Sequence, residues 1–183
     1  MTGRQLDDLR QVFPEVSVFD RVIAENGALL YRPQQQEVRM LAQPPAPEFS
    51  QALRRAGVEP IFMGRVVVAT VQPNETAAAA VIRNLGLDLR VILNKGSVMI
   101  LPSSIDKASG LAAALAELGI PSFEVVAAGD AENDQAMLDV CGYGAAVANA
   151  TEDLRREADF VTRNPNGAGV RELIDSILEG PTS

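Results

Sequence analysis

A cluster of acidic side chains directly after an apolar segment is the pattern in this sequence that most directly indicates chemistry. Residues 125–128 read VVAA and residues 129–134 read GDAEND, so three carboxylates and one amide follow an expected buried strand. Carboxylates gathered in this way repel one another unless a cation neutralises them, and their oxygens suit Mg²⁺. The pattern therefore predicts a metal site with Asp130 and Asp134 among its residues.

Two other structures also place carboxylates at such positions. Asp130 or Asn133 could cap the helix that follows, a contribution of about 1 kcal/mol, but a cap accounts for one residue and not for the cluster. A calcium-binding EF-hand loop needs glycine at its sixth position and glutamate at its twelfth. The sequence has Gln135 and Cys141 at those positions, which excludes this loop.

A lysine and a hydroxyl stand at the expected starts of two helices. Lys107 follows SSID at residues 103–106, which favour a helix start, so its charge lies where the helix dipole disfavours a cation. Either the lysine extends into water or an anion compensates it, and beside the acidic cluster we favour the anion. Thr2 and Gln5 have the spacing of a capping box, whereas Thr2 followed by Gly3 could equally bind an anion through the hydroxyl and free amides.

Composition excludes several classes of function. The 183 residues carry a net charge of −8 and a pI near 4.6, which argues against nucleic-acid binding because that needs a basic face. With no histidine and one cysteine, the chain cannot form a Cys/His zinc site, a disulfide framework or a histidine-based catalytic triad. Apolar stretches such as 66–71 are too short to span a bilayer and no leader-like segment opens the chain. We therefore expect a cytoplasmic protein without membrane contact.

The first part of the chain predicts short elements and an insertion. In order, the expected elements are a helix over 4–13, strands over 16–19, 22–24 and 28–31, and a turn at 25–27. Proline-rich segments at 32–36 and 43–47 bracket a single strand and mark the entry of an inserted subdomain. Inside it, the expected elements are helices over 48–56 and 73–85, a strand over 61–71, and a hairpin of 89–94 and 97–101 turned at Lys95. The insert is therefore predicted to be α+β.

From residue 102 onward helices and strands alternate, which is typical of a parallel sheet with helices on its faces, an α/β fold. The expected elements are helices over 107–118, 133–140, 152–158 and 170–178, and strands over 123–128, 145–148 and 160–161. Ligands of such sheets bind outside the carboxyl ends of the strands. The acidic cluster falls at such an end.

Five segments match one family in order and spacing: TGR at 2–4, AENGALLY at 24–31, LPSSIDKASGL at 101–111, GDAENDQAML at 129–138 and AVANATEDLRREADFVT at 146–162. They resemble the Cof-like phosphatases of the haloacid dehalogenase (HAD) superfamily. The resemblance covers nearly the whole chain and implies a Rossmann-like core, residues 1–32 plus 102–183, with an inserted α+β cap, residues 33–101. It also implies Mg²⁺-dependent hydrolysis of a phosphate monoester of a small metabolite through an aspartyl-phosphate intermediate.

The same resemblance implies a phosphate-binding group of residues. Thr2 corresponds to the hydroxyl that holds the phosphoryl oxygens, with Gly3 beside it, and Lys107 to the cation that orients nucleophile and phosphate. Asn133 corresponds to a polar contact to the phosphoryl group. Thr2 and Lys107 are thus the expected catalytic residues, in a reaction that depends on positioning and on neutralising charge.

The metal-binding group implied by the resemblance is Asp130 as the ligand and Asp134 as its supporting carboxylate. The family's first motif, DxDGT, carries the nucleophilic aspartate and the general acid/base aspartate, and it does not occur in these 183 residues. We therefore expect weak or no activity from this chain alone. Without that segment the chain also lacks the middle strand of the family's sheet and most of its neighbour. Either the true start lies upstream of Met1, or another chain supplies these strands.

Two functional hypotheses follow. The first is an enzyme, a Mg²⁺-dependent phosphatase acting on small phosphorylated metabolites. The alternative is a non-catalytic module, derived from such a phosphatase, that binds phosphorylated ligands or partners. Substrate choice is assigned to the cap and its flanks, where Glu25, Arg32, Arg65 and Asn94 are the candidates for facing the crevice. An exposed sheet edge would favour pairing with a second copy as a homo-oligomer.

Overall fold

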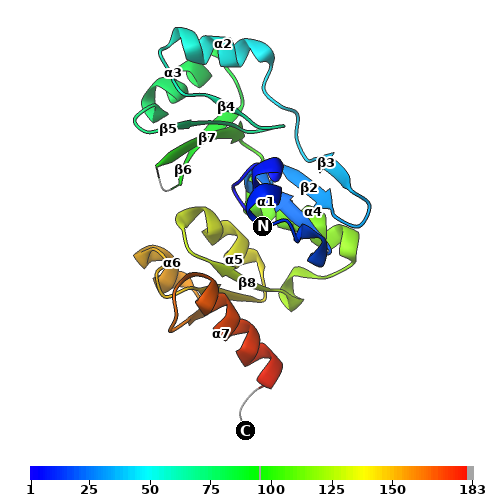
Figure 1. The fold of residues 1–183 in the computed structure, drawn as a ribbon. Coiled ribbons are helices and arrows are strands. Elements are labelled where there is room, and N and C mark those ends of the chain that lie inside the picture. The colour runs from blue at the N-terminus through cyan, green and yellow to red at the C-terminus, as the bar shows by residue number, and fades with distance from the viewer. Residues whose placement is uncertain (95, 181–183) are drawn as a thin grey trace. The chain divides into compact units, whose positions relative to one another are not determined.

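The computed structural model describes residues 1–94 and 96–180 (Figure 1). They divide into two compact units, residues 1–114 and residues from 115 onward; the first contains two sheets and the second one. Helices and both parallel and antiparallel strands are present, so the predicted α/β class is confirmed. No helix in the described part of the chain combines the length and the apolar character that a membrane span requires.

The first unit begins with a short helix and a three-stranded antiparallel sheet. In order, its elements are α1 (Leu6–Val12), η1 (Val16–Val18), β1 (Val22–Ala24), η2 (Glu25–Gly27), β2 (Leu29–Arg32) and β3 (Glu37–Met40), with the sheet order β1-β2-β3. The prediction of a strand over 16–19 is wrong. The N–H of Val18 donates to the carbonyl of Glu15 and that of Phe19 to the carbonyl of Val16, so the segment bonds to itself as a 3₁₀ turn.

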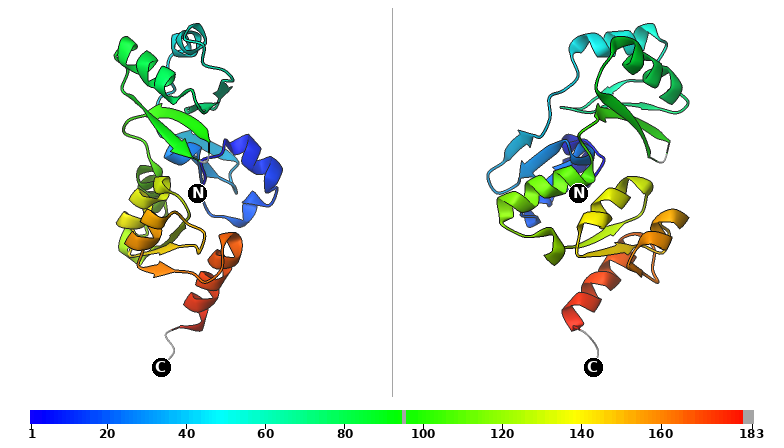
Figure 2. Two further views of the ribbon diagram at one scale, coloured as in Figure 1. Left: turned by 90° about the vertical axis from the view of Figure 1, so that its left-hand side faces the viewer. Right: turned by 180° about the vertical axis from the view of Figure 1, so that it is seen from behind.

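A four-stranded antiparallel sheet with two helices on one face follows in the same unit (Figure 2). In order, its elements are α2 (Pro47–Arg55), β4 (Phe62–Met63), β5 (Val68–Val71), α3 (Glu75–Leu85), β6 (Leu89–Asn94) and β7 (Ser97–Pro102), with the sheet order β4-β5-β7-β6. This is the α+β arrangement predicted for the insert. The predicted hairpin is β6 and β7, and its turn residue Lys95 lies outside the described residues.

The strand predicted over 61–71 is divided in two. β4 and β5 pair antiparallel, with Phe62 opposite Ala69, and residues 64–67 form the bend between them. The bend starts at Gly64, where a Cβ would lie 2.7 Å from a carboxylate oxygen of Glu25 and 2.8 Å from the carbonyl oxygen of Val67. The apolar run in the sequence predicted extended backbone correctly. The one local sign of the reversal was Gly64, because an isolated glycine in a strand pattern often marks a bulge or a close backbone approach.

The strand β3 pairs with β2, although it falls within the predicted cap of residues 33–101. It therefore extends the first sheet, and the four-stranded sheet with its two helices occupies the chain from Pro47 to Pro102. Division of the chain into core and cap at the predicted boundaries stays a prediction.

The second unit is built around a three-stranded parallel sheet. In order, its elements are η3 (Ser122–Glu124), β8 (Val126–Gly129), η4 (Glu132–Asp134), α5 (Gln135–Val140), β9 (Tyr143–Ala146), α6 (Glu152–Glu157), β10 (Phe160–Val161) and α7 (Asn166–Glu179), with the sheet order β10-β9-β8. The predicted alternation of helix and strand and the parallel pairing are both confirmed. Residues 129–134 begin at the carboxyl end of β8, as expected.

Candidate functional site

Thr2 is held beside β1 by its backbone. Its N–H donates to the carbonyl of Ile23 at 2.8 Å, and its carbonyl accepts the N–H of Asn26 at 3.1 Å. Its hydroxyl accepts the N–H of Arg4 at 3.1 Å. Helix α1 starts only after Gln5 and no side chain caps it, so the capping box of Thr2 and Gln5 does not form. The alternative that explained Thr2 by helix capping is therefore removed.

The loop η2 (Glu25–Gly27) next to Thr2 has an uncommon backbone. The φ angle is 50° at Glu25, 54° at Asn26 and 107° at Gly27. Residues other than glycine adopt this region only where their surroundings determine it, at a cost of about 1–3 kcal/mol each. Here the N–H of Glu25 donates to the carbonyl of Arg4 at 3.0 Å, in addition to the bond from Asn26 to Thr2. The loop is therefore fixed to the segment that carries the predicted phosphate-binding hydroxyl.

Lys107 is the first residue of α4 (Lys107–Leu118), as predicted. Asp106 and Ser109 cap this helix reciprocally: the N–H of Ser109 donates to Asp106 Oδ1 at 2.7 Å, and the N–H of Asp106 to Ser109 Oγ at 2.9 Å. Lys107 is only 8% exposed. The alternative of a lysine extended into water is therefore wrong. A buried ammonium at a helix N-terminus requires negative charge close to it, because both burial and the helix dipole oppose the cation.

The loop η2 also contacts the start of α4. A Cβ on Gly27 would lie 1.9 Å from the carbonyl oxygen of Asp106 and 3.3 Å from the nitrogen of Lys107. A Cβ on Gly110 would lie 2.5 Å from the Cα of Gly27. Both positions require glycine because the two backbones touch. Thr2 and Lys107, which are distant in the sequence, are thus held by the same three-residue loop.

The acidic residues 129–134 fold around the carboxylate of Asp134, which is 5% exposed. Its Oδ2 accepts the N–H of Asp130 at 2.9 Å and that of Ala131 at 3.1 Å. Gly129 makes room for this arrangement, since a Cβ there would lie 2.5 Å from the Cβ of Asp134. The carboxylate that bonds the backbone is thus that of Asp134, and the suggested caps from Asp130 or Asn133 do not form on α5.

The oxygen donors of this loop are of the kind that Mg²⁺ uses. Asp130 is half-buried and lies at the end of β8, whereas Asp134 already uses one oxygen to hold the backbone. Among residues 1–94 and 96–180, no three Cys, Asp or Glu side chains gather into a metal-binding group. Mg²⁺ commonly binds one or two carboxylates together with waters and substrate phosphate oxygens. The residues therefore fit a Mg²⁺ ion held chiefly by Asp130, with Asp134 supporting the loop.

The predicted site residues fall into two groups. Thr2, Gly3 and Lys107 lie in Met1–Ala114 and share the loop η2, where a Cβ on Gly3 would be 3.1 Å from Asn26 Oδ1. The second group lies in the other unit, in the loop after β8, and consists of Asp130, Asn133 and Asp134. Each group is local and well fixed. That the two groups bind one phosphoryl group and one cation stays a prediction.

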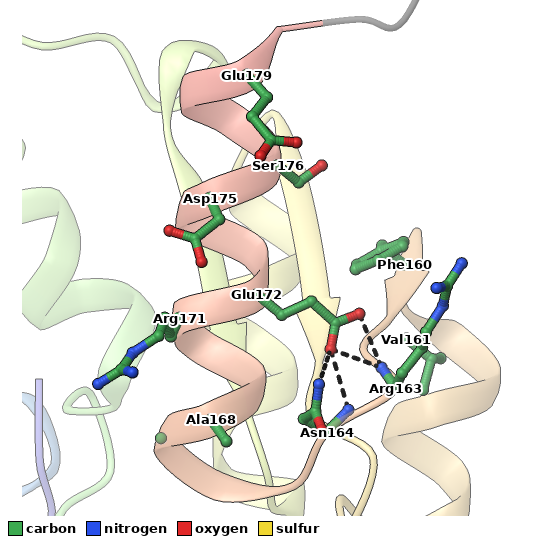
Figure 3. A pocket seen from close by; sticks show the side chains of 11 residues that line it. Phe160, Val161, Arg163, Asn164, Ala168, Arg171, Glu172, Asp175, Ser176 and Glu179 are labelled. Atoms are coloured by element: carbon green, nitrogen blue, oxygen red, sulfur yellow. Dashed lines mark hydrogen bonds between the residues drawn. The ribbon is translucent and has the colours of Figure 1, made fainter.

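A groove of 860 Å³ lies beside α7 (Figure 3). In it, Glu172 accepts the N–H of Arg163 and the N–H of Asn164, each at 3.0 Å, and the side-chain amide of Asn164 at 2.8 Å. The backbone N–H of Arg163, more than the bonds from Asn164, holds the pKa of Glu172 below its ordinary value. No predicted site residue lines this groove, and the bonds of Glu172 serve to fix the segment before α7.

The role of Glu25 is what the sequence did not reveal. It was a candidate for facing the crevice, but its side chain is 1% exposed. Of the other candidates, Arg32 pairs with Glu37 at 2.6 Å, Arg65 is largely exposed, and the side chain of Asn94 is outside what the structure describes. The sequence carries no local signal for this burial, because a glutamate in a short loop between two strands is ordinarily exposed.

Comparison with known proteins connects these groups to one family. A family model of haloacid dehalogenase-like hydrolases matches residues 67–174, more than half of the chain. The chain belongs to this family. The matched region of this HAD-family chain contains Lys107 and the whole acidic loop after β8, so the resemblance inferred from the motifs is confirmed.

Three curated relatives of this HAD-family chain are named as phosphoglycolate phosphatases. The protein of Methanothermobacter thermautotrophicus is 29% identical over 160 residues, covering 84% of this chain and 70% of that protein. The protein of Methanopyrus kandleri is 37% identical over 138 residues, covering 72% and 59%. Phosphoglycolate phosphatase 2 of Saccharolobus solfataricus is 42% identical over 91 residues, covering 50% and 39%. The chain therefore spans between 39% and 70% of the length of these relatives.

Solved structures share the fold. A haloacid dehalogenase-like hydrolase from Bacteroides thetaiotaomicron matches with a TM-score of 0.79 at 20% identity, over 96% of this chain and 84% of that one. One from B. subtilis matches with a TM-score of 0.76 at 17% identity, over 96% and 86%. These likenesses confirm the predicted HAD-type fold, and at such identities they concern the fold alone.

Proposed function

We propose that the protein hydrolyses phosphate monoesters of small metabolites with the help of Mg²⁺. The observation that carries the proposal is the family match over residues 67–174, because it contains a buried lysine at a helix start and an acidic loop at the end of a parallel strand. Phosphoryl transfer depends mainly on positioning and on neutralising charge. Both kinds of group are held here by short loops with several backbone hydrogen bonds.

The residues divide the work as follows. The Thr2 hydroxyl and the Gly3 amide bind phosphoryl oxygens, and the Lys107 ammonium neutralises their charge as the leaving group departs. Asn133 gives a further polar contact to the phosphoryl group. On the metal side, Asp130 binds Mg²⁺, and Asp134 keeps the backbone around it in place through its bonds to two N–H groups. Bound Mg²⁺ would supply further positive charge at the phosphoryl oxygens.

Phosphoglycolate is the first substrate to test, because relatives with 29% to 42% identity carry the name of phosphoglycolate phosphatase. The two-carbon acid carries both a phosphate and a carboxylate. Its binding would therefore need cationic or N–H donors in addition to those that bind the phosphate.

The competence of these 183 residues alone is a separate question. They contain no DxDGT motif, so we expect the chain alone to bind phosphate with little or no turnover, since a covalent nucleophile is missing. A binding module derived from a phosphatase would behave in the same way. The DNA upstream of the Met1 codon separates the two: an in-frame DxDGT after a plausible start favours the enzyme.

The test combines turnover and binding on the same preparation. Hydrolysis of phosphoglycolate and of an aryl phosphate is measured with Mg²⁺ and with EDTA, and binding of inorganic phosphate by calorimetry. Lys107→Met should weaken phosphate binding or turnover about 100-fold, and Asp130→Asn should remove the response to Mg²⁺. Arg83→Met and Asp175→Asn are matched controls on exposed positions and should change neither.

Each outcome decides something. Mg²⁺-dependent turnover that Lys107→Met abolishes supports the enzyme and contradicts the expectation that the chain alone is inactive. Saturable phosphate binding without turnover, if Lys107→Met weakens it, supports the phosphate-binding site. It would favour the non-catalytic binding module over the enzyme. Absence of both phosphate binding and turnover in the unaltered chain contradicts the proposed function.

A further inference from the structure

Glu25 makes the most extensive long-range side-chain contact described in the first unit. Its Oε1 accepts the N–H of Arg65 at 2.9 Å, and its Oε2 accepts the N–H of Val66 at 2.9 Å and that of Val67 at 2.8 Å. The acceptor and these donors are 40 to 42 positions apart in the sequence. Three successive backbone N–H groups that converge on one anion form a nest, an arrangement that binds negative charge strongly.

The bend that supplies these donors is shaped to receive the carboxylate. The N–H of Gly64 donates to the carbonyl of Val67 at 2.8 Å, which closes the bend. A Cβ on Gly64 would lie 2.7 Å from Glu25 Oε2, so glycine is needed for the carboxylate to enter. The bend joins β4 to β5 and therefore belongs to the four-stranded sheet of the predicted cap.

On its other side, Glu25 belongs to the loop that holds the phosphate-binding group. The N–H groups of Glu25 and Asn26 bond the segment that carries Thr2, and Gly27 touches the backbone at the start of α4, where Lys107 lies. Asn26 in addition places its amide on the sulfur of Met99 in β7. The loop η2 thus has contacts to the Thr2 segment, to α4 and to the four-stranded sheet.

We propose that Glu25 is a positioning residue that couples the four-stranded sheet to the phosphate-binding group of Thr2 and Lys107. This rests on the proposed function, because it assumes that those residues bind phosphate. Phosphate bound at Thr2 and Lys107 restrains the loop η2, and the Glu25 carboxylate transmits the restraint to residues 65–67. Since coupling is reciprocal, loss of the carboxylate weakens phosphate binding.

Glu25→Gln is the informative variant. Glutamine keeps the shape of the side chain but offers one acceptor oxygen, and its NH₂ group meets a backbone N–H where the second oxygen was. Glu37→Gln is the matched control, because Glu37 is exposed and pairs only at the surface with Arg32. A purely structural role for Glu25 would lower stability without changing how the folded chain responds to phosphate.

Hydrogen exchange of the whole chain, followed by mass spectrometry with and without inorganic phosphate and Mg²⁺, reads out this response. In the unaltered chain, phosphate should slow exchange in peptides containing Thr2 and Lys107 and in the peptide covering residues 65–67. In Glu25→Gln the slowing at 65–67 should be lost and the Kd for phosphate should rise about tenfold. Glu37→Gln should behave like the unaltered chain.

Failures of the two proposals look different. If phosphate slows exchange at Thr2 and Lys107 in both the unaltered chain and Glu25→Gln, and residues 65–67 respond equally or not at all, the coupling is wrong and the proposed function stands. If the unaltered chain shows no slowing at Thr2 and Lys107, the proposed function is wrong and the coupling falls with it.

A second variant covers the case in which Glu25→Gln does not fold. Gly64→Ala keeps the Glu25 carboxylate but places a methyl group of the bend against it. In this variant, too, phosphate should no longer slow hydrogen exchange at residues 65–67. Gly167→Ala is its control, since a Cβ there meets no atom within 4 Å. An unchanged response at 65–67 in Gly64→Ala would overturn the coupling.

Discussion

Two buried carboxylates in this chain, Glu25 and Asp134, bond backbone N–H groups, and they differ in how far they reach. Asp134 bonds the N–H groups of Asp130 and Ala131, four and three positions away, and so organises a loop within itself. Glu25 bonds three N–H groups at least 40 positions away, and so connects two different sheets. The contacts of Asp134 therefore shape the loop after β8, whereas those of Glu25 position the loop η2 relative to the four-stranded sheet of the same unit.

The largest expected effect comes from removing the long-range carboxylate. Glu25→Ala leaves three buried N–H groups without their acceptor and should lower the free energy of unfolding by about 3 kcal/mol or more, since each such group costs about 1–3 kcal/mol. Urea denaturation followed by circular dichroism measures it, with Glu37→Ala as the control. A loss no larger than that of the control would show that the contact contributes little to stability.

The backbone contact between η2 and α4 should give the next largest effect. In Gly110→Ala the new methyl group would lie 2.5 Å from Gly27 Cα and 2.8 Å from Ile23 Cγ2. Overpacking of this kind costs about 1–3 kcal/mol, partly offset by the better helix propensity of alanine. We expect a net loss of about 1–2 kcal/mol in the same denaturation experiment. Gly167→Ala, in open space within α7, should be neutral or stabilising.

Removal of the local carboxylate should cost less. Asp134→Ala deprives two N–H groups of one shared acceptor, and we expect a loss of about 1–2 kcal/mol. Asp134→Asn should cost less than Asp134→Ala, because a single amide oxygen can take the place of Oδ2 for both donors. At Glu25 the glutamine variant should remain costly, because both oxygens accept bonds there. A loss for Asp134→Asn as large as that for Asp134→Ala would contradict this explanation.

The smallest effect concerns Glu172 in the groove beside α7, another carboxylate that bonds backbone N–H groups, in this case at the surface. Because those bonds lower its pKa in the folded chain, its contribution to stability is present above the ordinary carboxyl pKa of about 4.3 and is lost as the pH falls through the lowered value. The stability difference between the unaltered chain and Glu172→Gln should therefore shrink as the pH falls below that range. Glu157→Gln, on the exposed face of α6, should show no such pH dependence.

Local features of the sequence predicted the local parts of the fold. The helix that starts at Lys107 was predicted with its bounds, because Asp106 and Ser109 form its cap within four residues. The end of α3 at Gly86, where φ is 60°, was predicted for the same reason. The acidic loop after β8 could be placed at a strand end because β8 and its polar successor are adjacent in the chain.

The features that escaped prediction depend on contacts between distant residues. The reversal at residues 64–67 lies in an apolar run interrupted only by Gly64 and Arg65, and the Glu25 carboxylate that holds it in place comes from about 40 positions away. Segment 16–18 has apolar residues that suit a strand, but it bonds to itself as a 3₁₀ turn. For the site, the residue types and their loops were predictable, whereas the loop that holds both Thr2 and Lys107 became visible only through the contacts of Gly27.

Glu25 binds the bend at residues 64–67 through main-chain N–H groups and not through side chains. This limits which substitutions the bend can accept, in evolution or in design. Proline is excluded at positions 65, 66 and 67, where each N–H is used, and a side chain at position 64 would press against the Glu25 carboxylate. The side chain of Arg65 takes no part in this contact and makes a long surface ion pair with Asp7, 3.9 Å. A foreign segment grafted in place of Pro47–Pro102 would therefore need a hairpin that presents a glycine followed by three such amides.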